Sequence, residues 1–112
     1  MKKFLVLYMM AHSGMEAWMK TDESIRKAEE EKMKKEWDAW TADHKDMIIE
    51  SAGAGQMTKV TQGSSSEGHN DVMMYSLVQG ESKEAVAKMF ENHPHFGIPA
   101  AWIEIMPASV IA

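Results

Sequence analysis

Two histidines on either side of a proline are the residues of this chain best suited to chemistry. His93 and His95 flank Pro94 in a stretch that should be a rigid loop. An imidazole changes its charge near neutral pH, so either residue could act as a general base. The alternative is structural: His93 would cap the preceding helix, where an imidazolium favours the dipole, and His95 would hydrogen-bond or pack within the loop. The residues alone leave both interpretations open.

The same pair also offers two imidazole ligands to a metal. Two ligands fall short of the about four that a tetrahedral site uses, so His12, His44 or Glu104 would have to complete it. The chain has no cysteine, which excludes disulfides, thiol nucleophiles and thiolate ligands. We predict no resident metal and no organic cofactor, and we expect a cytoplasmic protein.

Glu104 is a carboxylate within an apolar strand, on the same face as Trp102 and Met106. A buried carboxylate must be paired or its pKa must rise, and such groups become general acids or bases. If the face is solvated instead, Glu104 is an ordinary polar strand residue. We take His93, His95 and Glu104 as the candidate catalytic residues.

Four further residues are candidates for contact with a ligand. Tyr8 and Tyr75 lie on two apolar strands and could supply hydroxyl groups to a cleft, although core packing is the alternative. His12 follows the first strand at its rim, and Trp102 accompanies Glu104.

Composition limits the classes of partner. The chain has 112 residues, of which 45% are apolar and 26% charged, with a net charge of −5. This size and composition indicate one globular domain over residues 1–112. Its densest lysine stretch, residues 32–35, lies among glutamates, so a nucleic-acid partner is not expected. The apolar run at residues 4–11 resembles a short signal peptide but reads better as a strand, and no run reaches the ~20 residues of a membrane span.

Apolar patterning and turn residues predict the elements that must position these side chains. Pro94 should stop the preceding helix near Asn92, and Pro107 should close the last strand. A capping box at Ser13 and Glu16 would begin a short helix. The expected strands are residues 3–11, 56–62, 72–79 and 102–106; the expected helices are residues 14–20, a long helix from Thr21 or Asp22 to before Ile48, and residues 82–92. Residues 63–70 should form a flexible hairpin loop.

The order β-α-β-β-α-β predicts a ferredoxin-like α+β domain, with four antiparallel strands and the helices on one face. The long helix has one apolar stripe, formed by Ile25, Ala28, Met33, Trp37, Trp40, His44 and Met47. The first, third and fourth strands are apolar on both faces, and helices can cover only one of them. We therefore expect a homodimer whose two sheets pack face to face or close into a shared barrel.

Residues 91–96 (ENHPHF), 103–107 (IEIMP) and 1–8 (MKKFLVLY) carry a resemblance to the YCII-related domain proteins, of the dimeric α+β barrel group. The resemblance covers nearly the full chain and implies a ferredoxin-like dimer. A few members resemble small-molecule enzymes, including a dehydrochlorinase of aromatic degradation, with a His/Asp pair as acid and base. This chain departs from that pattern. It has Trp37 and Trp40 where those relatives have a helical histidine, and His93-Pro94 where they have Asp-Pro.

The function predicted from these residues is binding of a small organic molecule near the His-Pro-His loop. Cofactor-free proton transfer, elimination or isomerisation would use His93 or His95 as base and Glu104 as its partner. The competing hypothesis is a dimeric binding or interaction module without catalysis.

Overall fold

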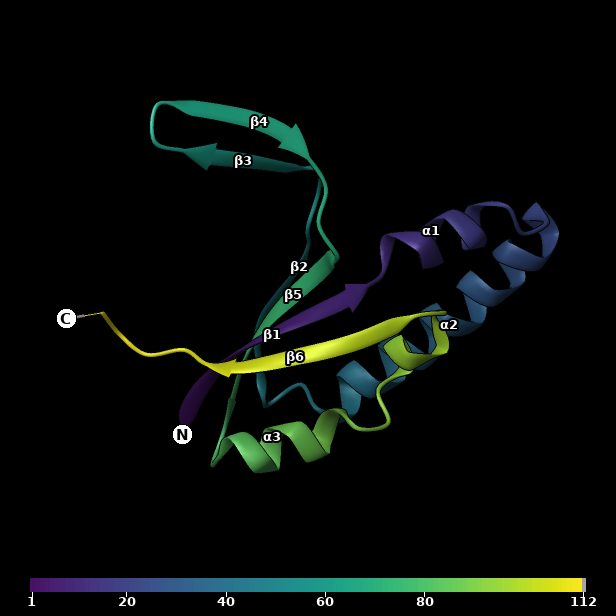
Figure 1. Cartoon of the computed structure of the whole chain (residues 1–112). Coiled ribbons are helices and arrows are strands. Elements are labelled where there is room, and N and C mark those ends of the chain that lie inside the picture. Colours follow the sequence, from purple (N-terminus) through teal and green to yellow (C-terminus); the bar gives the residue numbers. More distant parts are fainter. Residues whose placement is uncertain (112) are drawn as a thin grey trace.

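The computed structural model describes residues 1–111 and has an α+β architecture (Figure 1). Its elements in chain order are β1 (Lys2–Met10), α1 (His12–Met19), α2 (Glu23–Asp43), β2 (Ile48–Gly53), β3 (Met57–Thr61), β4 (Ser64–Gly68), β5 (Val72–Gly80), α3 (Lys83–Phe90), the 3-10 turn η1 (Pro94–Gly97) and β6 (Ala101–Pro107). Within residues 1–111, no helix has the length and apolar character needed to cross a membrane.

The main sheet has four antiparallel strands in the order β2-β5-β1-β6, which confirms the predicted ferredoxin-like fold. The apolar strand β1 is central and pairs with both β5 and β6. Residues directly opposite each other on neighbouring strands point to the same face. Leu7 therefore shares its face with Tyr75 on β5 and Glu104 on β6.

The core fills the space between the sheet and the helices α2 and α3. Six side chains that are each no more than 2% exposed form it: Phe4, Val6, Tyr8, Val78, Val86 and Phe90. Trp37 and Trp40 of α2 pack against this cluster. The predicted stripe of α2 is therefore correct in its second half, whereas Ile25 in the first half is 55% exposed.

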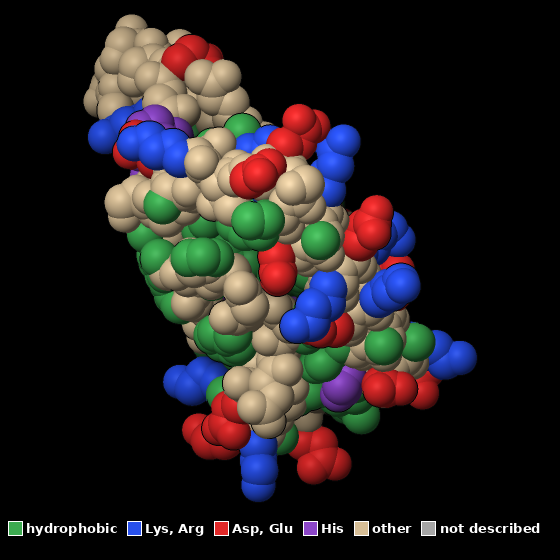
Figure 2. All heavy atoms as spheres, turned by 90° about the vertical axis from the view of Figure 1, so that its right-hand side faces the viewer, with side chains coloured by type: hydrophobic (Ala, Val, Ile, Leu, Met, Phe, Trp, Pro, Cys, Tyr) green, Lys and Arg blue, Asp and Glu red, His purple; other side chains and the backbone are tan. Residues whose placement is uncertain are grey.

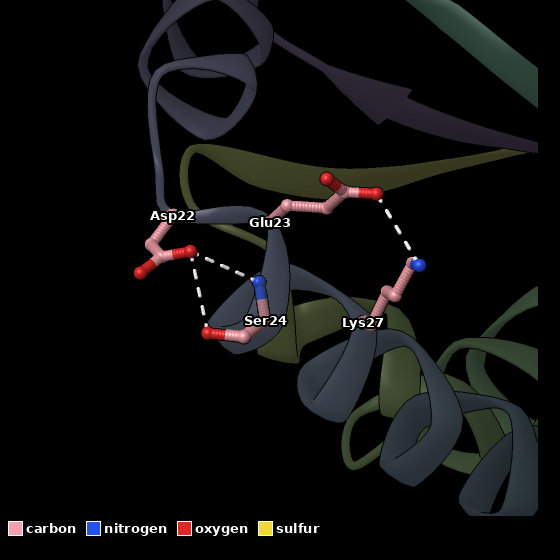
Figure 3. Close-up of polar contacts among 4 residues, drawn as sticks. All are labelled: Asp22, Glu23, Ser24 and Lys27. Atoms are coloured by element: carbon pink, nitrogen blue, oxygen red, sulfur yellow. Dashed lines mark hydrogen bonds and ion pairs between the residues drawn. The ribbon is translucent and has the colours of Figure 1, made fainter.

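The N-terminus of α2 follows the prediction closely. Asp22 is the N-cap residue, and its carboxylate accepts hydrogen bonds from the backbone N–H and the hydroxyl of Ser24, at 3.1 and 3.2 Å (Figure 3). Such a cap satisfies backbone donors that the first helical turn leaves without partners. One turn further on, Glu23 and Lys27 form an ion pair at 3.2 Å (Figure 3). Both residues are exposed, so this pair adds little to stability.

The strand predicted at residues 56–62 is present as β3, but it does not belong to the main sheet. The segment that pairs with β5 is β2, residues 48–53, and its ladder has an irregularity between Ile48 and Glu50. Residues 57–61 instead form a hairpin with 64–68, a segment expected to be a flexible loop. Gly63 makes this turn possible with a φ of 83°, a left-handed conformation that glycine adopts without strain.

The hairpin β3–β4 projects from the rest of the domain, as the two labelled arrows in Figure 1 and the pale projection at the top of Figure 2 show. Its strands pair with each other and belong to a separate sheet.

Figure 2 also shows that hydrophobic side chains gather on one part of the helical side of the molecule, whereas charged side chains gather on another.

The predicted capping box at the start of α1 was also wrong. The helix begins at His12, its N-cap residue is Ala11, and no side chain caps it. Gly14, rather than Ser13, is the residue that positions α1. A Cβ atom at Gly14 would lie only 3.0 Å from both the Ala100 Cβ and the Pro99 carbonyl oxygen. The absent side chain therefore lets α1 approach the loop before β6.

The core predicts a clear difference between two valine-to-alanine substitutions. Val86 is 1% exposed, whereas Val110 is 95% exposed. We expect Val86→Ala to lower the free energy of unfolding by about 2 kcal/mol, from lost burial and the cavity left behind. Val110→Ala should change it by less than about 0.5 kcal/mol. Urea unfolding monitored by circular dichroism measures both, and equal effects would contradict this description of the core.

Candidate functional site

The His-Pro-His loop is an ordered turn between α3 and β6. His93 has an extended conformation, with φ −64° and ψ 141°, as the following proline requires. It is the N-cap residue of η1, and its Nδ1 atom accepts a hydrogen bond from the His95 backbone N–H at 2.9 Å. An acceptor nitrogen carries no proton, so the neutral ring of His93 has its proton on Nε2.

His95 anchors this loop to the central strand of the sheet. Its Nε2 atom lies 2.7 Å from the Met9 carbonyl oxygen, and the side chain is 1% exposed. A carbonyl only accepts hydrogen bonds, so Nε2 must be the protonated donor. This nitrogen is therefore already used in a structural bond. This arrangement agrees with the alternative in which His95 has a structural role, in packing and hydrogen bonding, rather than a catalytic one.

Aromatic rings surround His93. Its ring centroid lies 4.3 Å from those of Trp37 and Trp40, 5.3 Å from that of Tyr8 and 5.6 Å from that of Phe90. The Nε2 atom is buried and has no hydrogen-bond partner among the described residues. The ring of Trp37 meets the imidazole at 85°, a T-shaped contact. Such a cage stabilises a neutral imidazole by packing and does not present it to solvent.

Both histidines are held in the neutral form. Burial lowers the pKa of His93 to about 3, and the nearby imidazoles of His95 and His44 act in the same direction. Burial also lowers the pKa of His95, partly offset by hydrogen bonds with the backbone of Met9 and Trp102. A group that stays unprotonated through neutral pH and lacks access to solvent is poorly suited to general acid–base catalysis.

The structure does not bring Glu104 to the histidines. Glu104 lies opposite Leu7 in the ladder, whereas the neighbouring Tyr8 points toward the helices and His93. Successive strand residues alternate between faces, so Glu104 lies on the face of the sheet that no helix covers. Its carboxylate accepts a hydrogen bond from the Trp102 indole N–H at 2.7 Å. The expected partnership between Glu104 and a loop histidine is therefore not present within the chain.

The other candidate ligand contacts are also separated. Tyr8 is buried in the core and its hydroxyl hydrogen-bonds to Ser76 at 2.9 Å; burial raises the pKa of this phenol. Tyr75 lies on the uncovered face and donates a hydrogen bond to Glu50 at 3.0 Å. His12 lies at the end of the sheet.

His12 forms an unexpected contact with a second histidine. Its ring stacks on that of His69, with centroids 4.0 Å apart, and its Nε2 atom lies 3.2 Å from the Glu16 carboxylate. Both rings are exposed, and no set of three or more metal-ligating side chains gathers anywhere in residues 1–111. We therefore assign no metal site to this cluster.

A cavity of about 330 Å³ beside the loop is the feature that sequence reasoning missed. Its walls come from the end of β1, from α1, from the first half of α2, from β5 and from the loop before β6. The lining residues are Met10, Met15, Trp18, Met19, Glu29, Glu30, Met33, Met73, Gly97, Ile98 and Pro99. Most of this surface is apolar, and five methionines contribute to it. The volume is within the range of about 300–1,000 Å³ that small-molecule sites usually have.

Part of this cavity has a signal in the sequence. Met15, Trp18 and Met19 recur at the spacing of one helical face, which indicates an apolar surface on α1. The packing of α1 and Met33 over the loop is a tertiary arrangement, however. It depends on Gly14, where an added Cβ atom would lie only 3.0 Å from the Pro99 carbonyl oxygen; at Gly97 an added Cβ atom would make an ordinary contact with the Met33 Cε atom, at 3.4 Å.

Comparison with known proteins supports the fold. No protein-family model matches the chain, and no curated protein matches its sequence. Among solved structures, it is similar to a 5-chloro-2-hydroxyhydroquinone dehydrochlorinase from Burkholderia phenoliruptrix AC1100 in complex with 2,5-dihydroxybenzoquinone. The TM-score is 0.52 and the identity 14%, over 91% of this chain and 90% of that one. This likeness shows a shared α+β fold, and membership of the YCII-related proteins remains a prediction.

The buried histidines predict that folding stability falls in acid. The pKa of His93 is about 3 in the folded protein against 6.5 for an unperturbed imidazole, so the unfolded chain takes up its proton first. The contribution of this residue to folding stability is fully present above pH 6.5 and is lost as the pH falls toward 3. Within this window, the free energy of unfolding should fall by about 1.4 kcal/mol per pH unit. His95, whose pKa is also lowered, acts in the same direction.

Urea unfolding of the wild type and of His93→Asn at pH 7 and pH 5 measures this dependence. Asparagine can still accept the hydrogen bond at the start of η1, so the turn should persist while the titrating group is removed. The exposed residue His69 offers the control His69→Asn, which should keep the wild-type dependence. An unchanged pH dependence in His93→Asn would contradict the assignment.

Proposed function

We propose that this protein binds a small, largely apolar organic molecule in the cavity under α1, as a homodimer and a divergent relative of the YCII-related proteins. The cavity is the observation that carries the proposal. Thioethers are flexible and polarisable, so methionine-rich walls adapt to irregular apolar ligands. The structural neighbour was solved with a ring compound, 2,5-dihydroxybenzoquinone, which supports a ring-sized ligand for this fold.

The geometry favours binding over catalysis at the His-Pro-His loop. The acceptor nitrogen of His93 is occupied by a backbone N–H, and the donor nitrogen of His95 is occupied by the Met9 carbonyl. Neither imidazole is among the residues that line the cavity. The non-catalytic module is therefore the better supported of the two functions predicted from the sequence.

Catalysis is retained as the second candidate because of one specific observation. A solved structure that shares this fold is that of an enzyme, and Gly97, which lies in the same turn as His95, lines the cavity. A reaction there would need the loop to release His95 from Met9. The hydrogen bond between His95 and Met9 would then oppose turnover, and removing the Glu104 carboxylate would not affect it.

The uncovered face of the sheet supports the homodimer. Half-buried apolar side chains from the central strands, among them Leu5, Leu7 and Leu77, lie on this face. Its carboxylate groups on Glu50 and Glu104 each accept a hydrogen bond from an aromatic side chain of the same chain. This reduces the number of unpaired polar groups that a partner would bury. A second copy of the same sheet, burying about 800 Å² on each subunit, would match it.

Ligand binding should depend on the cavity wall. We expect the neutral fluorescent probe N-phenyl-1-naphthylamine to bind the wild type, and Met33→Gln to weaken its affinity about tenfold, because the amide must be buried against an apolar ligand. Met57→Gln in the hairpin is the matched control and should bind as the wild type does. Fluorescence titration measures all three affinities. If Met33→Gln bound the probe with the wild-type affinity, the cavity would not be the binding site.

Dimer formation should depend on the uncovered face. We expect the wild type to have twice the chain mass at micromolar concentration, in size-exclusion chromatography with light scattering. Leu7→Glu should be a folded monomer, because it places a charge at the centre of the proposed interface. Ala39→Glu, on an exposed position of α2, should remain dimeric. A monomeric wild type would overturn the homodimer without affecting the cavity.

A further inference from the structure

Two acidic residues of α2 are among the residues that line the largely apolar cavity. Glu29 and Glu30 of α2 line it, and neither is in an ion pair with another described residue. The nearby lysines of the helix have other partners: Lys27 pairs with Glu23, Lys32 with Glu36 and Lys34 with Asp38.

The one arginine near this region is also engaged elsewhere. The Arg26 guanidinium donates a hydrogen bond to the Met19 carbonyl oxygen at 3.1 Å. No lysine, arginine or histidine is among the residues that line the cavity in the described part of the chain. An anionic ligand would therefore find negative charge and no counter-charge at this site.

From this charge distribution we infer that the cavity selects an organic cation, such as an aromatic or alkyl amine or a quaternary ammonium compound. The inference rests on the proposed function and specifies the chemical class of its ligand. The apolar part of the ligand would lie against Met33 and the other methionines, and its charged group would lie near Glu29 and Glu30.

Two physical effects favour this class over neutral and anionic ligands of the same shape. Carboxylates attract a cation, although at an exposed site the attraction is modest and is screened by salt. Trp18 contributes an indole to the wall, and quaternary ammonium groups bind aromatic surfaces through cation–π interactions. The chain as a whole has a net charge of −5, which also favours the approach of cations.

Three ligands of matched shape test the inference: benzyltrimethylammonium, its neutral isostere neopentylbenzene and the anion phenylmethanesulfonate. Their affinities follow from displacement of N-phenyl-1-naphthylamine from the intact protein. We expect the cation to bind at least about tenfold more tightly than the anion, with a difference that shrinks as salt is added.

Substitution of Glu29 and Glu30 tests whether these two residues cause the preference for the cation. Glu29→Gln combined with Glu30→Gln should weaken binding of the cation about fivefold to tenfold and leave the neutral isostere unchanged. Glu31→Gln is the control, since Glu31 is on the same helix but does not line the cavity.

The possible outcomes separate this inference from the proposed function. If the probe binds but the anion binds as well as the cation, or the double variant binds the cation unchanged, the charge preference is wrong and the cavity remains a ligand site. If neither the probe nor any of the three compounds binds, the proposed function fails together with the inference.

Discussion

One buried hydrogen bond holds the loop after α3 against the end of the central strand. His95 donates it to the Met9 carbonyl oxygen at 2.7 Å, between residues far apart in the chain. If the buried Met9 carbonyl lost this donor, the folded protein would be destabilised by about 1–3 kcal/mol. This cost favours one position of the loop. Gly97 and Pro99 then take their places in the cavity wall, beside Met10 at the end of β1. The same bond occupies the imidazole that the sequence makes most attractive as a base.

The sheet divides the candidate residues between its two faces. The helical face contains Tyr8 and the two loop histidines, all buried in an aromatic core. The uncovered face contains Tyr75 and Glu104, each in a hydrogen bond with a neighbour of its own chain. Alternation along a strand imposes this division, so no adjustment of side chains within one subunit can unite the two sets. The ligand cavity lies at the end of the sheet, where α1 and α2 extend past it.

Local rules predicted the parts of the fold that depend on local chemistry. Strong apolar runs predicted β1, β5 and β6, Asp22 predicted the start of α2, and Pro94 predicted the extended His93. The position of β2 was missed because residues 53–55, with two glycines, resemble a break, and its pairing with β5 is irregular. The serine-rich β4 is a strand because it pairs across a tight turn, which composition does not reveal. The cavity combines side chains from four elements and a loop, so only tertiary packing could show it.

Imidazole ¹⁵N chemical shifts would test most directly whether the loop histidines are structural groups beside a separate binding cavity. At pH 7, we predict protonated Nε2 atoms on both His93 and His95, an unprotonated Nδ1 atom on His93, and no change in these protons when a ligand fills the cavity. His93 should remain neutral at pH 5, because burial holds its pKa near 3. Titration of His93 near the unperturbed value of 6.5, or a proton that moves on either ring when ligand binds, would contradict this account and return the loop to acid–base chemistry.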